Sequence, residues 1–295
     1  MILETHELSK NYGSITAADG LSLNVEEGTA FGLLGPNGSG KTTTLGMILS
    51  VLSPDSGSYK WFGMQPESKV YKGIGSLLEV PNFFPYLSLK RNLEIISRIR
   101  EVNTADIDRV LDETGLIKRK SSRFDTLSLG MKQRMGLAAS LLGSPSVLVL
   151  DEPANGLDPE GIAEVRKLIL LQREKRKTII MASHILDEVE KVCTHVCILK
   201  KGKMVTSGKV NDLLVLDDVV IASVDRPEEF KADIEKTDLV KKVSLAGSSL
   251  EIIPGEGKVA SDINSFAFSK GYVLTELKVR KSTLEEQFLE IVKKK

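Results

Sequence analysis

The amino-acid sequence predicts an α/β protein: a mostly parallel sheet covered by helices, followed by a smaller α+β region. Three observations lead to this prediction. Short apolar runs alternate with amphipathic segments between residues 29 and 200, as in chains that alternate strand and helix. A long helical pattern interrupts the alternation between about residues 81 and 142. The character of the sequence changes again near Asn211, where strands and helical segments become shorter.

Length and charge limit the classes of protein to consider. The chain has 295 residues, which at roughly 150 residues per domain suggests two domains, and we place them at 1–211 and 212–295. Lys and Arg number 40 and Asp and Glu also number 40, so there is no basic excess of the kind that nucleic-acid binding usually requires. Two cysteines cannot make a disulfide framework, which predicts a reduced, cytoplasmic protein.

The elements of the first domain follow its apolar runs. A buried strand at 29–34 is followed by a helix at 42–52, which Ser53-Pro54 ends. Asp158-Pro159 is an N-cap followed by proline at the first helical position, which predicts a helix to about Lys175. The other expected elements are strands at 58–62, 74–78, 147–150, 178–182 and 195–200, helical segments across 87–141, and a helix at 185–192.

The second domain is expected to be a small α+β domain. Its predicted strands are 219–224, 250–253 and 273–279, with helical segments between them. Ser282-Thr283-Leu284-Glu285 is typical of a capping box and predicts a final helix at 284–292.

Residues 35–42 match the pattern G-x-x-x-x-G-K-[ST] between a predicted strand and a predicted helix. In that context backbone N–H groups and the helix N-terminus surround phosphate oxygens. Lys41 would reach the β- and γ-phosphates, and the Thr42 hydroxyl would hold Mg²⁺. A glycine-rich turn without a ligand is the alternative. The nucleotide-binding residues expected here are Gly35, Pro36, Asn37, Gly38, Ser39, Gly40, Lys41, Thr42 and Thr43.

Two acids follow the apolar strand at 147–150. Ligands of open α/β sheets bind at the carboxyl ends of the strands, where Asp151 and Glu152 would emerge. Asp151 would support Mg²⁺, and Glu152 would orient and deprotonate an attacking water. The alternative, a pair of helix-capping acids, loses weight beside a phosphate-binding loop.

Residues 127–134, Leu-Ser-Leu-Gly-Met-Lys-Gln-Arg, resemble the LSGGQ signature of the ATP-binding-cassette (ABC) transporter nucleotide-binding subunits. Leu129 and Met131 depart from that pattern, and an ordinary helix N-terminus capped by Ser128 is the alternative. The resemblance implies a P-loop ATPase fold with an antiparallel β subdomain and a helical insertion. It also implies a head-to-tail homodimer, in which Ser128 and Gly130 of one copy close over the γ-phosphate held by Lys41 of the other.

Further positions match the ABC pattern in chain order. Tyr12 occupies the place of the aromatic residue that stacks on adenine, although a core tyrosine would give the same sequence. Asp158 ends a loop, 155–158, that resembles the segment crossing the dimer interface. His184 resembles the switch histidine that contacts the γ-phosphate, and it joins Glu152 and Lys41 as an expected catalytic residue.

Glu79 stands where the family usually has a glutamine that helps hold Mg²⁺. A carboxylate also ligates this hard cation, so the expected metal ligands are Thr42, Glu79 and Asp151. Phe83, Phe84 and Tyr86 follow, and the resemblance implies that this region lines a groove for a membrane subunit, with core packing as an equal alternative. The segment 77–85 resembles the bacitracin-resistance and lantibiotic-immunity branch.

Together these motifs predict an ATP- and Mg²⁺-dependent ATPase that powers export through separate membrane subunits, on the cytoplasmic face of the membrane. The expected cargo is an antimicrobial peptide, an antibiotic or a similar amphiphile. The alternatives are a soluble ABC ATPase acting on ribosomes or DNA, or export of another substrate such as lipid or ions.

Two further groups of residues are interpreted as structural. Cys193, His195 and Cys197 have the wrong spacing for zinc and lack a fourth ligand, which favours core packing. The cations of 173–177 are expected to be solvated at a helix C-terminus.

Overall fold

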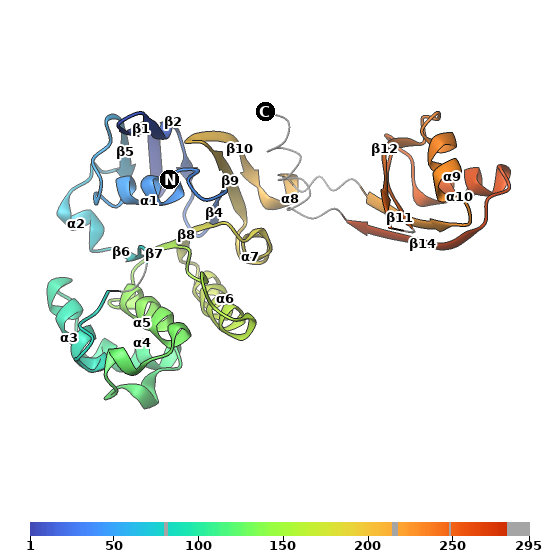
Figure 1. Ribbon diagram of the computed structural model, residues 1–295. Coiled ribbons are helices and arrows are strands. Elements are labelled where there is room, and N and C mark those ends of the chain that lie inside the picture. Colours follow the sequence, from blue (N-terminus) through green and yellow to red (C-terminus); the bar gives the residue numbers. More distant parts are fainter. Residues whose placement is uncertain (80–81, 214–217, 248, 282–295) are drawn as a thin grey trace. The chain divides into compact units, whose positions relative to one another are not determined.

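The computed structural model describes residues 1–79, 82–213, 218–247 and 249–281, and Figure 1 shows its elements. The chain divides into two compact units, residues 1–210 and 211–295. The first contains a mostly parallel six-stranded sheet, an antiparallel sheet and a helical insertion, and the second contains a four-stranded antiparallel sheet.

The central sheet of the first unit has the strand order β10-β9-β4-β8-β7-β6. Neighbouring strands are parallel except for β9 and β10, which are antiparallel. All residues of β4, β7 and β8 are buried, as expected for strands covered on both faces. The strands are β4 (Ala30–Leu34), β6 (Ile74–Leu77), β7 (Val147–Asp151), β8 (Thr178–Ser183), β9 (His195–Lys200) and β10 (Lys203–Lys209).

The antiparallel sheet is built around the first strand of the chain. β1 (Leu3–Tyr12) pairs with β2 (Ile15–Leu21), β3 (Asn24–Val25) and β5 (Ser56–Trp61). The sequence pattern does not predict the strands before residue 29 individually, because β1 is mostly polar and its pairings contain register shifts. One hydrophobic cluster joins this sheet to the central one, so both form a single core.

Helix α1 (Lys41–Ile48) is shorter than the sequence predicted. The prediction extended it to residue 52, but Ser50 adopts a positive φ of 59°. The N–H groups of Val51 and Leu52 both turn back to the carbonyl of Gly46, which closes the helix. The side chain of Leu52 packs there because Gly46 has no Cβ: one built on it would lie 2.8 Å from Leu52 Cδ1.

The insertion is helical, as predicted, and its described residues form three α-helices. Ser88 caps α3 (Leu89–Ile99) and Ser128 caps α5 (Leu129–Leu141), each accepting a backbone N–H, and α4 (Asp106–Glu113) lies between them in the chain. Two 3-10 turns, η1 (Ile117–Arg119) and η2 (Phe124–Thr126), connect α4 to α5. The other helices of this unit are α2 (Ser68–Tyr71), α6 (Pro159–Glu174), α7 (Leu186–Val192) and α8 (Val210–Leu213), the last of which extends past the unit boundary.

The cations of 173–177, at the end of α6, are only in part the solvated run that the sequence suggested. Lys177 is only 9% exposed, and burial lowers its pKa to about 8. Arg173 donates to the carbonyl of Val192 at 2.7 Å, and Lys175 pairs with Glu113 of α4 at 2.9 Å. Arg173 and Lys175 therefore connect this end of α6 to neighbouring helices. The prediction of solvation was wrong for buried Lys177 and half-buried Arg173, whereas Lys175 and Arg176 are exposed as expected.

The second unit has the order β11-α9-β12-β13-α10-β14 along the chain and β12-β13-β11-β14 across the sheet. This is the split β-α-β arrangement of ferredoxin-like domains. Phe230 and Ile234 of α9 and Ile263 and Ala267 of α10 share one core with the strands. Its elements are β11 (Asp218–Val224), α9 (Pro227–Ile234), β12 (Val240–Ala246), β13 (Ser249–Pro254), α10 (Ala260–Ser269) and β14 (Leu274–Lys281). The final helix and capping box predicted for residues 282–292 lie outside the described residues.

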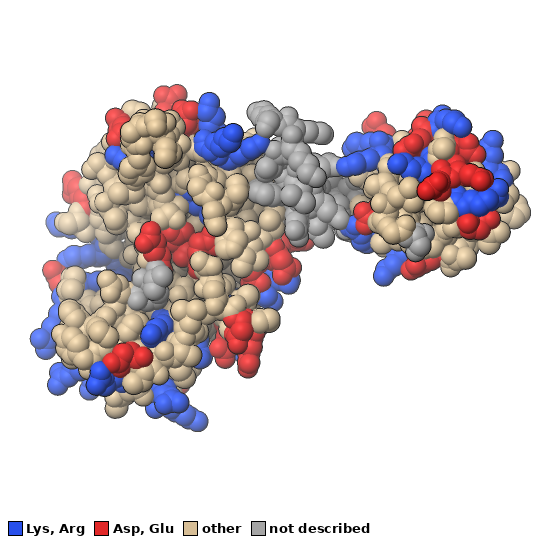
Figure 2. All heavy atoms as spheres, viewed as in Figure 1, with Lys and Arg blue, Asp and Glu red and all other residues tan. Residues whose placement is uncertain are grey.

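Basic and acidic side chains are interspersed over the visible face of each unit (Figure 2), in keeping with their equal numbers. Within the described part of the chain, no helix combines the length and the apolar character needed to cross a bilayer.

Candidate functional site

The loop between β4 and α1 is built to hold an anion. Gly40 has φ +102°, and a Cβ there would lie 2.0 Å from the carbonyl oxygen of Ala17, so only glycine fits. Pro36, Asn37 and Gly38 are exposed at the tip, whereas Ser39 is buried with its hydroxyl oxygen unpaired. The first turn of α1 adds backbone N–H groups without helical partners and the positive end of the helix dipole.

Lys41, Glu152 and His184 form one connected group. The Lys41 ammonium is buried and donates to the carbonyl of Gly35 at 2.8 Å. It lies 3.3 Å from Glu152 Oε1, while Glu152 Oε2 lies 2.8 Å from His184 Nδ1. The backbone N–H of His184 also donates to Glu152 Oε2 at 3.3 Å. The fold thus brings together the three residues that the sequence singled out for catalysis.

Asp151 is the most buried acid of the site. It is 2% exposed, and its Oδ1 has no hydrogen-bond partner. Burial raises the pKa of this carboxyl, the Thr42 hydroxyl opposes the shift, and the charges of Glu152 and Glu79 add to it. A buried, incompletely paired carboxylate beside a threonine hydroxyl is the donor set that a hard cation requires. Thr42 is exposed, and Thr43 is half-buried beside it on α1.

Two acids at neighbouring strand ends share an unusual backbone conformation. Glu152 has φ +46° and follows β7, and Glu79 has φ +53° and comes shortly after β6. The two strands pair in register, with Leu77 opposite Leu150. A non-glycine residue in this region costs on the order of 1 kcal/mol and is concentrated at functional sites. Sequence reasoning missed this strain, because no residue pattern marks a glutamate with positive φ.

Ser128, Gly130 and Asp158 lie in a second hollow. A groove of about 460 Å³ is lined by the start of α5 and by the loop that leads into α6. The Ser128 hydroxyl accepts from the N–H of Met131 at 3.3 Å, and Asp158 accepts from Gly161 at 2.9 Å, so both are helix caps. Among the described residues, no hydrogen bond or ion pair joins Ser128, Gly130 or Asp158 to the catalytic group, although the N–H of Asn155, in the loop that leads into α6, donates to the carbonyl of Glu152 at 3.0 Å.

Two other predicted features have a clear place. Tyr12 ends β1 and is 47% exposed, so it is not a core tyrosine, and the Lys10 ammonium lies 5.9 Å from its ring centre. Cys193 and Cys197 are buried free thiols, and burial raises the pKa of each to about 12. Both cysteines are therefore core residues.

Comparison with known proteins assigns the family. A family model described as "ABC transporter" matches residues 18–155. An uncharacterized ABC transporter ATP-binding protein of Bacillus subtilis (strain 168), YhcH, is 36% identical over 98% of this chain and 95% of its own length. This chain belongs to the ABC transporter ATP-binding proteins. Membership implies ATP binding and ATPase activity.

Other members of the ABC family have more informative names. The bacitracin transport ATP-binding protein BcrA of Bacillus licheniformis is 43% identical over 69% of this chain and 68% of its own length. The lantibiotic transport ATP-binding protein SrtF of Streptococcus pyogenes is 36% identical over 69% of this chain and 89% of its own length. The resemblance to this branch is confirmed, and a transporter subunit is favoured over an ATPase of ribosomes or DNA.

The fold agrees with this assignment. A solved structure described as the ATP binding subunit of an ABC transporter matches with a TM-score of 0.66 and 27% identity, over 72% of this chain and 92% of that one. The predicted α/β class with a mostly parallel sheet, an antiparallel β subdomain and a helical insertion is therefore confirmed.

Proposed function

We propose that this chain hydrolyses ATP to power export of an amphiphilic antibiotic or antimicrobial peptide through separate membrane subunits. The observation that carries the proposal is the Lys41–Glu152–His184 group at the carboxyl end of the parallel sheet. The cargo class follows from the relatives that are named for bacitracin and lantibiotic transport. The proposed location is the cytoplasmic face of the membrane.

Each residue of the group has a proposed task. Glu152 accepts a proton from the attacking water, since its carboxylate is held between a cation and an imidazole at the strand end. Lys41 offsets charge that develops on the terminal phosphate. His184 holds Glu152 in place and contacts that phosphate. Residues 35–43 bind the phosphates, and exposed Tyr12 stacks on the adenine.

The residues around Asp151 fit Mg²⁺. The unpaired Asp151 oxygen and the neighbouring Thr42 hydroxyl would hold the ion, with Glu79 as the third ligand. When bound, Mg²⁺ neutralises phosphate charge during phosphoryl transfer. Glu79 takes the place of the usual glutamine, and its carboxylate offers an anionic oxygen instead of an amide.

The second groove supplies the other half of the proposed site. Ser128 and Gly130 lie with residues 156–158 in one hollow, so a second copy of the chain would meet both elements together. A head-to-tail dimer would place this groove over the nucleotide held by residues 35–43 of the partner copy.

The membrane subunit is proposed to contact the helical insertion. A groove of about 440 Å³ lies between the central sheet and the insertion, with Tyr71, Phe83 and Ile96 among its lining. Phe83 also packs on Phe124, with ring centres 4.9 Å apart. Phe84 and Tyr86 do not line this groove but are 48% and 63% exposed, which leaves apolar surface available to a partner.

The Glu152→Gln variant tests the proposed function. Loss of a general base lowers rates by about 10² to 10⁴, so this variant should bind ATP, hydrolyse it at that reduced rate and remain as a closed dimer. Tagged variant would be extracted from host membranes with ATP in mild detergent, and co-purifying proteins would be identified by mass spectrometry. A polytopic membrane protein in stoichiometric amount is expected. Recovery of ribosomal or DNA-repair proteins instead would contradict the proposal, and near wild-type hydrolysis would place the base elsewhere.

A further inference from the structure

A bidentate ion pair joins helices α6 and α7 beside the candidate site. Arg166 Nε donates to Glu188 Oε2 at 2.9 Å, and Arg166 Nη2 donates to Oε1 at 2.5 Å. The Glu188 side chain is 8% exposed and that of Arg166 is 25% exposed. Two parallel, charge-assisted bonds to a nearly buried carboxylate fix both distance and orientation. None of the catalytic tasks proposed above uses this pair.

The two helices lead directly from the two loops that carry Glu152 and His184. Helix α7 begins at Leu186, just after His184, and α6 begins at Pro159, at the end of the loop that follows Glu152. Glu188 is in the first turn of α7, and Arg166 is about two turns into α6. Because a helix moves as a stiff element, the ion pair constrains where both loops lie.

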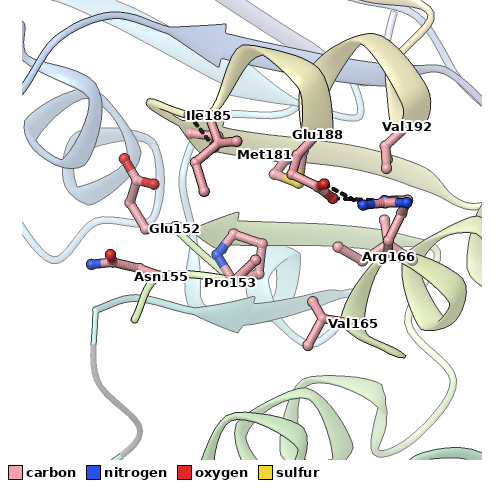
Figure 3. A pocket seen from close by; sticks show the side chains of 12 residues that line it. Glu152, Pro153, Asn155, Val165, Arg166, Met181, Ile185, Glu188 and Val192 are labelled. Atoms are coloured by element: carbon pink, nitrogen blue, oxygen red, sulfur yellow. Dashed lines mark hydrogen bonds and ion pairs between the residues drawn. The ribbon is translucent and has the colours of Figure 1, made fainter. Parts of the chain in front are cut away.

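A small cavity separates the ion pair from Glu152. Both lie on its wall, together with apolar side chains of β8, α6 and α7 that include Met181 and Val165. In Figure 3 the Glu152 carboxylate points away from the cavity while the dashed Arg166–Glu188 contacts lie on the other side. The cavity has a volume of about 10 Å³, which is room for about one water. This water-poor setting strengthens the pair electrostatically.

We propose that Arg166 and Glu188 are positioning residues for ATP hydrolysis. Their ion pair holds the first turn of α7 against α6 and so sets His184 at hydrogen-bond distance from Glu152. Neither residue touches the reacting atoms. The inference rests on the proposed function of Glu152 and His184.

Arg173 provides a matched control on the same two helices. Its side chain also joins α6 to α7, because it donates to the carbonyl of Val192 at 2.7 Å. Val192 is in the last turn of α7, at the end away from His184. Removing either arginine deletes one α6–α7 contact, whereas only Arg166 holds the end of α7 next to the site.

The test compares Arg166→Met with Arg173→Met in the full-length chain. The readouts are kcat, the Kd for a fluorescent ATP analogue and the thermal midpoint. A displacement of about 1 Å can lower a rate by 10²-fold, so we expect kcat of Arg166→Met to fall by about 10- to 100-fold. Its analogue Kd should change less than about threefold, because residues 35–43, which are proposed to bind the phosphates, stay in place and only the His184 contact is disturbed. Arg173→Met should keep kcat within about twofold of the wild-type value, although it should lose about as much thermal stability as Arg166→Met. Equal losses of kcat in both variants would overturn the proposal.

A second variant protects the test against misfolding. Arg166→Met leaves Glu188 buried without its partner, which is itself destabilising. Arg166→Met/Glu188→Gln removes that charge, and its kcat should remain low because the two-point contact is still missing. Return of kcat to the wild-type value would overturn the positioning role. The Glu152→Gln variant in the same assay separates the two ideas. If Glu152→Gln is inactive while Arg166→Met keeps its activity, only the ion-pair inference fails. If Glu152→Gln is fully active, the proposed function of Glu152 fails.

Discussion

The phosphate-loop half and the signature half of the first unit are built differently. In the phosphate-loop half, Lys41 and Asp151 are buried, and both Ser39 and Asp151 keep a buried oxygen without a partner. In the signature half, Ser128 is satisfied as a helix cap, and Leu129 beside it is 51% exposed. Unpaired buried polar atoms are costly unless a ligand satisfies them. The helical insertion also has two such atoms, Ser97 Oγ and Arg134 Nε, but those of Ser39 and Asp151 lie in the phosphate-binding loop and next to Thr42. The first half is therefore prepared for a ligand at its loop, whereas the second presents an exposed surface that a second copy could cover.

The largest expected effects come from Lys41→Met and Ser128→Arg, which test whether the two halves have separate roles. Lys41→Met removes a buried cation whose charge-assisted bonds are each worth about 1.5–3 kcal/mol, so nucleotide affinity should fall at least about tenfold. Ser128→Arg places a bulky cation in the exposed groove and should leave nucleotide affinity unchanged while stopping hydrolysis.

Lys41→Met should also be inactive, because it loses the cation proposed to offset charge on the terminal phosphate, so mixing the two inactive variants sharpens the comparison. In a head-to-tail dimer, a mixed pair contains one complete site, so the mixture should recover up to about a quarter of wild-type activity. Each variant mixed with itself is the control. If the mixture stays inactive, or if Ser128→Arg binds nucleotide as weakly as Lys41→Met, the two halves do not act on separate chains.

The same contrast explains what the sequence could predict. The loop at 35–42 and the acids at 151–152 depend on residue types at fixed spacing next to an apolar strand, and the structure places all of them at one edge of the sheet. The helix caps at Ser128 and Asp158 were predictable for the same local reason. The features that the sequence could not predict depend on contacts with residues far away in the chain or on backbone geometry.

Three examples show that limit. Arg166 and Glu188 are 22 residues apart, and only the packing of α6 on α7 joins them. Lys177 ends a run of cations that looks solvated, yet the fold of α4 beside it buries it. The positive φ of Glu79 cannot be seen in any residue pattern. In the second unit the sequence indicated the α+β class, but the order of its strands depends on long-range pairing.

Glu79→Gln should have a much smaller effect than changes at Lys41 or Ser128. Glu79 is exposed, and its charge acts on buried Asp151 from the neighbouring strand end. A glutamine restores the amide oxygen usual in the family, so hydrolysis should stay largely intact. Because an anionic ligand is lost, the Mg²⁺ concentration that gives the half-maximal rate should rise roughly a few-fold. Measuring ATPase activity against Mg²⁺ checks this.

Glu101→Gln is the matched control for this change. Glu101 is also an exposed glutamate with positive φ, 55°, but it pairs with Lys72, and its pKa is lowered by that contact. Its substitution should leave the Mg²⁺ dependence unchanged. An inactive Glu79→Gln enzyme would show that the carboxylate is essential and would refute the idea that Gln and Glu are interchangeable there.

The last expected effect is on stability and not on hydrolysis, and it concerns the junction between the helical insertion, which carries the signature, and the sheet, which carries the phosphate loop. Lys177 stands just before β8 and faces Arg109, Glu113 and Asp106 of α4, and Lys175. Burial and the two neighbouring cations lower its pKa from 10.5 to about 8, and the two acids oppose the shift. The folded state therefore disfavours the charged form, which costs stability at neutral pH.

Lys177→Met should relieve that cost. Below pH 8 the full penalty applies, since Lys177 is charged in both states; between pH 8 and 10.5 the unfolded chain binds more protons, so wild-type stability rises with pH. The variant should be more stable by about 1–3 kcal/mol at pH 7, and the difference should vanish near pH 10.5. Urea unfolding at several pH values measures it, with exposed Lys167→Met as the control. A variant less stable than wild type at pH 7 would mean that Glu113 and Asp106 stabilise the buried ammonium by more than burial costs, so that the junction is a favourable electrostatic contact between the two halves.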